Sequence, residues 1–152
     1  MAPETDSMKT ISQSLEDYIE AVYLLSVKVG SACVRDVAEF LGVKMPSVVK
    51  AVHELKEHGL VSQQPYSTID LTEEGKKVAK EIFGRHRLLC AFLCKLGVKE
   101  DIANIDACRM EHILSRETLQ AIGEFMGGEE AMKALYEESE EVAAAALKGN
   151  LL

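Results

Sequence analysis

The sequence has no long apolar run, and this sets its first limits. Apolar residues make up 47% of the 152 residues, yet no stretch of them is long enough to cross a membrane, which takes roughly 18 residues or more. Residues 1–6 lack the basic and apolar regions of a secretory signal. We therefore expect a cytoplasmic protein that does not engage a membrane.

Cysteine is scarce and irregularly spaced. The four cysteines, Cys33, Cys90, Cys94 and Cys108, do not follow the spacing of a disulfide framework. We expect them to be reduced thiols in a reducing compartment. The sequence also lacks an internal repeat, so it predicts one compact unit or two small domains that share a core.

Basic residues are few, with 17 Lys and Arg against 25 Asp and Glu and a net charge of −8. Overall charge alone would disfavour a nucleic-acid partner, but binding depends on where the charges lie. Much of the negative charge lies in residues 129–130 and 137–141. The first two thirds of the chain are closer to neutral and could carry a nucleic-acid-binding surface.

The first 75 residues predict a winged helix. Apolar residues of helical period predict one helix from an N-cap at Ser14 to Gly30, a short helix over 34–41, and a third helix over 46–59. Two successive helices joined by a glycine turn form a helix-turn-helix. Residues 60–71 predict two short strands around a polar turn. The strands would form a β-wing.

The rest of the chain predicts helices only. Their expected ranges are 72–97, 101–114, 117–126 and 129–148, with Thr72 and Ser115 as N-caps. The fold class is therefore mainly α, with one small β element.

The segment around residue 110 carries the strongest chemical signal. On a helix, Cys108, Glu111 and His112 stand at i, i+3 and i+4 and so leave one face within a single turn. Thiolate, carboxylate and imidazole are common ligands of divalent transition metals. The spacing predicts half of a coordination sphere, although Cys108 alone could be a small core residue.

Three further residues could complete the sphere. Asp17 and Glu20 stand at i, i+3 on the first predicted helix, where two carboxylates can hold one cation. The alternative is that these acids merely complement the dipole of the helix N-terminus. His86 lies in the long apolar helix and could also be a hydrogen-bonded interior histidine.

In these segments the chain resembles the diphtheria-toxin-repressor and manganese-transport-regulator family (DtxR/MntR). The resemblance covers roughly residues 14–125 and is carried by LEDYIEAVY at 15–23, VAEFLGVKMPSVVK at 37–50, GRHRLL at 84–89 and DACRMEHILS at 106–115. The family implies dimeric, metal-dependent repressors that bind operators of metal-uptake genes.

The resemblance also implies a ligand set. Asp17 and Glu20 match ligands of the manganese branch, and Cys108 matches the iron branch. The other three, His86, Glu111 and His112, match positions shared by both branches. At two positions of the iron branch's ancillary site, this chain has Cys90 and Asn104 instead of Glu and His.

The mixed ligand set predicts Fe²⁺ or Mn²⁺ as the cofactor. The thiolate favours Fe²⁺, whereas the carboxylates suit either ion. Zn²⁺, Co²⁺ and Ni²⁺ would bind in vitro, because raw affinity follows the Irving–Williams order.

Residues near the start of the third helix are the candidates for DNA contacts. They are Lys44, Pro46, Ser47 and Lys50, because the N-terminal end of a recognition helix meets the bases and phosphates. The two lysines could instead be ordinary solvated side chains. Val49 could be a buried residue or could contact a base methyl group.

Together these features predict two domains and a regulatory function. A winged helix-turn-helix DNA-binding domain would span residues 1–75, and a helical metal-binding and dimerisation domain would span residues 76–152. We expect a homodimer that binds double-stranded operator DNA when metal is bound, and not an enzyme. The alternatives are a metal-dependent hydrolase, in which Glu111 and His112 activate water, and a metal-independent winged-helix regulator.

Overall fold

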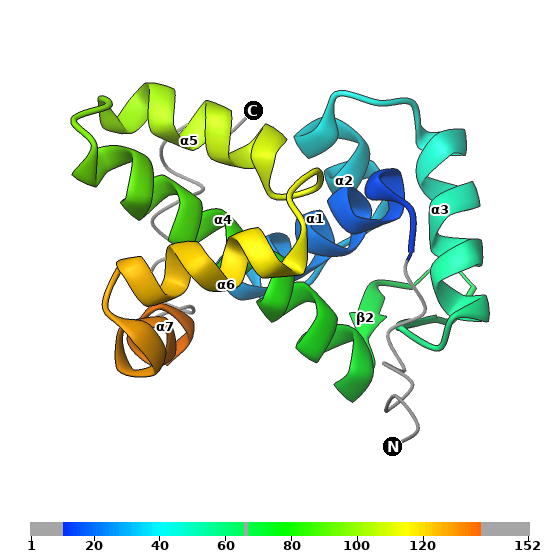
Figure 1. The fold of residues 1–152 in the computed structure, drawn as a ribbon. Helices are drawn as coiled ribbons and strands as arrows, with labels where there is room; N and C mark the ends of the chain where they lie inside the picture. Colours follow the sequence, from blue (N-terminus) through cyan, green and yellow to red (C-terminus); the bar gives the residue numbers. More distant parts are fainter. Residues whose placement is uncertain (1–10, 66, 138–152) are drawn as a thin grey trace, which may run out of the picture.

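The computed structural model describes residues 11–65 and 67–137 (Figure 1). Seven helices and two strands follow one another along this part of the chain: α1 (Gln13–Val29), α2 (Val34–Leu41), α3 (Met45–Glu57), β1 (Val61–Gln63), β2 (Ile69–Leu71), α4 (Glu73–Lys95), α5 (Glu100–Met110), α6 (Arg116–Phe125) and α7 (Gly128–Glu137). The mainly helical fold class is thus confirmed. None of the described helices has the length and apolar character needed to cross a membrane.

The N-terminal half is a winged helix-turn-helix, as predicted. Helix α2 ends at Gly42, whose left-handed backbone (φ 66°) turns the chain toward α3. Strands β1 and β2 pair antiparallel, with Val61 opposite Leu71 and Gln63 opposite Ile69. Ile69 also forms a bridge to Ala32, which ties the base of the wing to the segment between α1 and α2.

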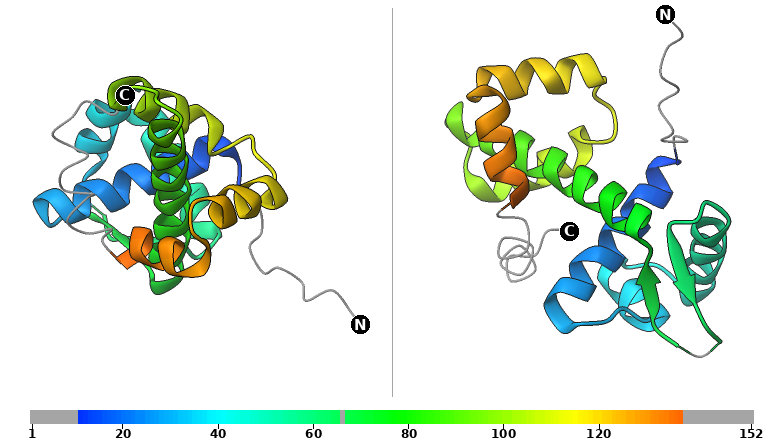
Figure 2. Two further views of the ribbon diagram at one scale, coloured as in Figure 1. Left: turned by 60° about the vertical axis from the view of Figure 1, so that its left-hand side comes forward. Right: turned by 90° about the horizontal axis from the view of Figure 1, so that it is seen from below.

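Helix α4 connects the two halves of the molecule. Its first half contributes Ala79, Ile82 and Phe83 to the core formed by α1, α2, α3 and the wing. Farther along α4, Leu88 and Leu89 are buried outside that core. The proposed domain boundary at residue 75 stays a prediction, because one continuous helix runs through the junction (Figure 2).

The C-terminal half is built on α4. Helix α5 packs along α4, and α6 and α7 pack against each other and against α4. The predicted caps of α4 and α6 are confirmed, since Thr72 accepts a hydrogen bond from the Gly75 amide and Ser115 accepts one from the Thr118 amide. The predicted helix over 129–148 is described only as far as Glu137, so the remainder of that prediction lies outside the described residues.

Two predicted helix ends are wrong. The N-cap of α1 is Ser12, not Ser14, because the extended backbone of Ser12 lets its hydroxyl accept from the Leu15 amide. Helix α5 ends at Met110 rather than Leu114. Ser115 needs an extended backbone to cap α6 (ψ 158°), so the chain must leave the helical path before it. As a result Glu111 is the C-cap of α5 and His112 lies in the following turn.

The close contact between Gly75 of α4 and Leu60, just before the wing, leads to a prediction about stability. A Cβ at Gly75 would lie 1.9 Å from the Leu60 carbonyl oxygen, which belongs to the backbone and cannot rotate away. We expect Gly75→Ala to lower the free energy of unfolding by about 1–3 kcal/mol or more, as overpacking does. Urea denaturation of the metal-free protein measures this.

The matched control is Gly123→Ala, also in a helix. Its added Cβ would meet the flexible Met132 side chain at 3.1 Å, and alanine favours the helix by about 1 kcal/mol over glycine. We expect little loss of stability. Equal destabilisation by both substitutions would contradict the steric argument.

Candidate metal centre

The six predicted metal ligands lie in two adjoining groups between α1, α4 and the end of α5. Asp17 and Glu20 project from α1, His86 from α4, and Cys108 from α5, while Glu111 and His112 follow at the α5 C-terminus. The first and last of these residues are 95 positions apart in the sequence. The fold thus brings these side chains into neighbouring positions, and their role as metal ligands stays a prediction.

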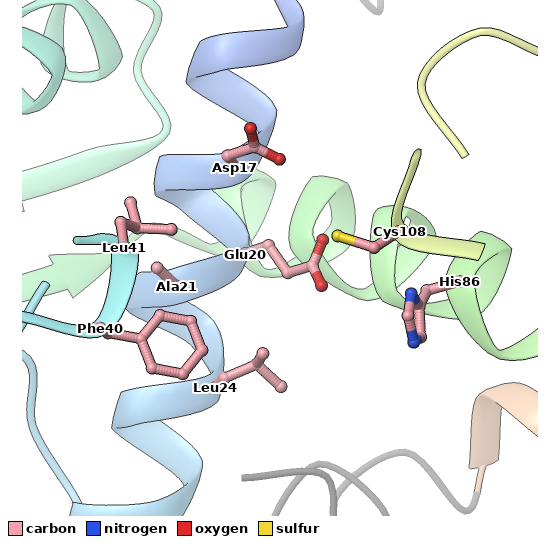
Figure 3. Close-up of a pocket in the computed structure, with 8 residues that line it drawn as sticks. All are labelled: Asp17, Glu20, Ala21, Leu24, Phe40, Leu41, His86 and Cys108. Atoms are coloured by element: carbon pink, nitrogen blue, oxygen red, sulfur yellow. The ribbon is translucent and has the colours of Figure 1, made fainter. Parts of the chain in front are cut away.

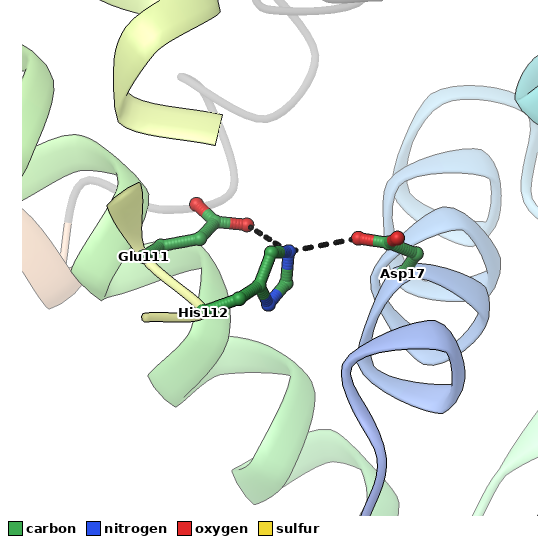
Figure 4. Close-up of side chains that lie close together, drawn as sticks. All are labelled: Asp17, Glu111 and His112. Carbon is green, nitrogen blue, oxygen red and sulfur yellow. Dashed lines mark ion pairs between the residues drawn. The ribbon is translucent and has the colours of Figure 1, made fainter. Parts of the chain in front are cut away.

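Asp17, Glu111 and His112 form the tightest group (Figure 4). One donor atom from each lies within 4.8 Å of the other two. His112 Nε2 lies 2.8 Å from Asp17 Oδ1 and 3.3 Å from Glu111 Oε1. Two carboxylates and one imidazole thus face a common point.

Two buried atoms of this group lack a well-aligned hydrogen bond among the described residues. His112 Nε2 and Glu111 Oε1 are both buried, and among the described residues they have only the ion-pair contacts given above, without a well-aligned hydrogen bond. The Glu111 side chain is 0% exposed. A buried carboxylate oxygen without a donor is costly. A divalent cation would satisfy both atoms at once, so the residues present fit a metal ion.

The remaining three predicted ligands lie beside this group. Glu20, His86 and Cys108 line a small cavity together with Asp17 and with apolar side chains of α1 and α2. In Figure 3 the Glu20 carboxyl reaches from α1 toward His86 and Cys108. His86 Nδ1 lies 3.1 Å from Glu111 Oε2, which links the cavity to the Asp17 group.

In the absence of a metal ion, the surroundings of this cluster favour the protonated forms of several of its side chains. Burial and the Glu111 charge raise the pKa of Glu20 well above its usual value, and burial raises the pKa of Glu111 to about 7. The nearby Asp17 and Glu16 carboxylates raise the pKa of His112 to about 10. Burial and the Glu111 charge raise the pKa of the Cys108 thiol to about 12. These groups would have to lose protons to bind a metal ion.

Sequence reasoning missed Glu16, which orients His112. His112 Nδ1 lies 2.7 Å from Glu16 Oε2, and the other Glu16 oxygen lies 3.3 Å from Arg85 Nη2. Burial alone would raise the pKa of Glu16, but the His112 and Arg85 partners outweigh it and hold the pKa below its usual value. A metal-ligating histidine commonly donates its second ring N–H to a carboxylate in this way.

Arg85 extends the same network to the backbone. It donates to the Glu111 carbonyl at 3.3 Å as well as to Glu16. Arg85 thus connects α4, α1 and the C-terminus of α5. The only sequence signal was that Glu16 precedes Asp17 and Arg85 precedes His86, which does not show where these side chains point.

His86 and its neighbours differ from the ancillary site of the iron branch. His86 Nε2 lies 3.3 Å from Asn104 Oδ1, and the Cys90 thiol donates to the same oxygen at 3.3 Å. Burial lowers the pKa of His86. His86 is thus a hydrogen-bonded interior histidine in this state, and its role as a ligand stays a prediction.

The dipole explanation for Asp17 and Glu20 loses its support. With Ser12 as the N-cap, the acid in the first turn of α1 is Glu16, and the two predicted ligands lie beyond it. The effect of the helix dipole falls off within the first turn.

The four cysteines are all free thiols, with no disulfide between them in the described residues.

The predicted DNA-contacting residues lie at the start of α3. Lys44 is its N-cap, and Pro46 stands in its first turn. Both residues are exposed, as are Ser47 and Lys50. Helix α3 lies at an edge of the molecule, away from the helices of the C-terminal half (Figure 1).

Comparison with known proteins identifies the family. A family model described as the iron dependent repressor, N-terminal DNA binding domain, matches residues 10–69, and one described as the metal binding and dimerisation domain matches residues 72–131. The chain belongs to this family. It is a metal-dependent, DNA-binding transcriptional regulator and not an enzyme, so the hydrolase alternative is set aside.

The names of individual relatives agree with this family assignment. The transcriptional regulator MntR of Salmonella typhimurium is 41% identical over 107 residues, which cover 70% of this chain and 68% of the relative. MntR of Bacillus pumilus is 38% identical over 128 residues, 84% of each protein. The solved structure of the manganese regulator SloR superposes with a TM-score of 0.64 at 27% identity, over 74% of this chain. The chain spans about half the length of that structure (53%).

The contact between Glu16 and His112 leads to a prediction about the affinity for Mn²⁺. We expect Glu16→Gln to weaken Mn²⁺ binding about 10- to 100-fold, because loss of such an orienting carboxylate typically costs that much. Calorimetric titration with Mn²⁺ measures the change. Glu39→Gln, at an exposed position of α2, is the control and should bind as the parent does. Equal affinities for all three proteins would show that Glu16 does not orient the ligand.

Proposed function

We propose that Asp17, Glu20, His86, Cys108, Glu111 and His112 bind Fe²⁺ or Mn²⁺, and that binding fixes α1 relative to the end of α5. One observation carries the proposal: donor atoms of Asp17, Glu111 and His112 lie within 4.8 Å of one another although they come from the two halves of the chain. A bound divalent cation supplies the positive charge that lets these carboxylates ionise together.

The residues themselves explain why metal would change the state of the protein. Without metal, Glu20 and Glu111 are a buried carboxyl pair in which the charge of one raises the pKa of the other. Asp17 and Glu20 belong to the helix that packs against α2 and α3 of the DNA-binding unit. A change in how α1 meets Glu111 and His112 would therefore move that unit as a whole.

DNA recognition would use two copies of the chain. In a homodimer on double-stranded operator DNA, the two α3 helices must enter successive major grooves, roughly 34 Å apart. Lys44, Pro46, Ser47 and Lys50 would contact bases and phosphates there. A coupling of about 1–3 kcal/mol between the metal site and the DNA site would change affinity roughly 5- to 150-fold.

The identity of the metal rests on Cys108. A thiolate favours a softer ion than an all-oxygen site would, so we favour Fe²⁺ over Mn²⁺. Zn²⁺, Co²⁺ and Ni²⁺ would bind in vitro. The proposed role is repression of iron- or manganese-uptake genes in the cytoplasm.

Removal of a ligand tests the proposal directly. We expect Glu111→Ala and His112→Ala to abolish metal-stimulated DNA binding, because each removes a donor from the tightest group. Gel shifts with Mn²⁺, anaerobic Fe²⁺ and chelator measure this, on a duplex selected from random sequences with the parent protein and Mn²⁺. Circular dichroism and sedimentation check that the variants remain folded dimers.

Equal shifts by the parent protein with metal and with chelator would refute the proposal. That result would favour the remaining alternative, a regulator whose acidic cluster is purely structural.

The metal preference has its own test. We expect Cys108→Glu to shift the preference toward Mn²⁺, because an oxygen ligand replaces a thiolate. The ratio of Fe²⁺ to Mn²⁺ needed for half-maximal DNA binding, measured without oxygen, reports the change. Cys94→Ser is the control, because Cys94 is exposed and does not line the cavity. An unchanged ratio in Cys108→Glu would exclude the thiolate as the basis of the preference.

The salt dependence of DNA binding tests Lys50. If Lys50 neutralises one phosphate, Lys50→Ala should reduce the slope of log affinity against log salt by about one. Fluorescence anisotropy at several salt concentrations measures the slope. Lys99→Ala, at the exposed N-cap of α5, should leave it unchanged. A Lys50→Ala slope equal to that of the parent would remove this residue from the interface.

A further inference from the structure

The exposed side of α3 carries two large apolar side chains. Met45 is 49% exposed and Val49 is 55% exposed. They are four residues apart on the helix, so they lie side by side on one face. Val49 is therefore not a buried residue. Of the two possibilities named in the sequence analysis, only the contact with a base methyl group remains.

The core does not account for this apolar face. The inward side of α3 is formed by Val48, Ala51, Val52 and Leu55, which are all buried. They pack against α1, α2 and β1 without help from Met45 or Val49. Met45 and Val49 are thus free of core contacts and available to a partner outside the described part of this chain.

The charges around this face indicate the kind of partner. Lys44 and Lys50 flank it, and both are exposed. No acidic residue occurs between Val43 and His53, and the first acid of α3 is Glu54. In a chain of net charge −8, this stretch is apolar and cationic. Such a surface complements a ligand that combines negative charge with exposed methyl groups.

The major groove of DNA is such a ligand. Its phosphates carry the negative charge, and each thymine presents a C5-methyl group at the groove edge, a feature that cytosine lacks. We propose that Met45 and Val49 contact thymine methyl groups and so determine the bases that this protein prefers. The inference rests on the proposed function, because it takes α3 to be the helix that enters the groove.

A second copy of the chain fits this face less well. A stable protein interface buries about 800 Å² on each partner, and two side chains on one helix cover far less. Symmetric pairing would also bring the lysines of one copy close to those of the other. The face is small and cationic, as expected for a groove contact.

The test removes single methyl groups from the DNA. Duplexes would be selected from a random pool with the parent protein and Mn²⁺, and each thymine of the selected site would then be replaced by deoxyuridine. We expect one or two positions per half-site at which this replacement weakens binding about three- to tenfold, as the loss of one or two buried methyl contacts predicts. This scan needs no protein variant.

Protein variants then assign the methyl contacts. In Val49→Ser or Met45→Gln, at least one sensitive position should respond to deoxyuridine by about twofold or less, since its apolar partner is gone. Val29→Ser is the matched control, because Val29 is 66% exposed on α1, and it should keep the full response. Circular dichroism and Mn²⁺ affinity check that the variants retain the parent's fold and metal site.

The outcomes separate this inference from the proposed function. If neither Mn²⁺ nor anaerobic Fe²⁺ enriches any duplex over a selection with chelator, the proposed function fails. If duplexes are enriched but deoxyuridine has no effect anywhere, or has the same effect on both variants as on the parent, the methyl contact is overturned while metal-dependent DNA binding stands. A change in dimerisation of Val49→Ser with an unchanged deoxyuridine response would assign the face to a protein contact instead.

Discussion

The structure depends on one contact between the two halves of the chain, in which a half-exposed Asp17 meets buried groups. Asp17, from the helix that also packs against the DNA-binding unit, meets Glu111 and His112 at the end of α5. Groups with charge of one sign rarely gather at a buried place, because desolvation and repulsion both oppose it. Here protons on neighbouring groups offset part of that cost, and a cation would offset the rest. Under the proposed function, this junction is where binding of a small ion would change the relation between the two halves.

Hydrogen bonds and ion pairs around the junction orient its donor atoms in the absence of a metal ion. Glu16 holds one nitrogen of His112, and Arg85 holds Glu16 and the Glu111 carbonyl. The donor atoms are thus oriented by partners that do not themselves face the centre. Such preorganisation lowers the ordering cost of binding. It also gives the metal-free protein a definite arrangement, since the Glu16–Arg85 ion pair joins α1 to α4 without a metal ion.

At the other end of the DNA-binding unit, α3 combines lysines with an exposed apolar pair. The lysines would supply affinity that is independent of base sequence, and Met45 and Val49 would supply discrimination between bases. The acidic character of the chain as a whole does not conflict with this, because the stretch from Val43 to His53 contains no acid. Net charge describes the whole molecule, whereas recognition depends on one helix face.

Local features of the fold could be predicted from the sequence because they depend on neighbouring residues. Gly42, Thr72 and Ser115 terminate or cap helices through bonds that span a few residues, and helical periodicity located every helix that the structure describes. The ligand types followed from spacing and family resemblance. The choice between Ser12 and Ser14 and the early end of α5 depend on local backbone geometry that helical periodicity does not specify, whereas the partners Glu16 and Arg85 were decided only by tertiary structure. The contacts of Glu16 with Arg85 and with His112 join residues 69 and 96 positions apart, a distance over which spacing in the sequence carries no geometric information.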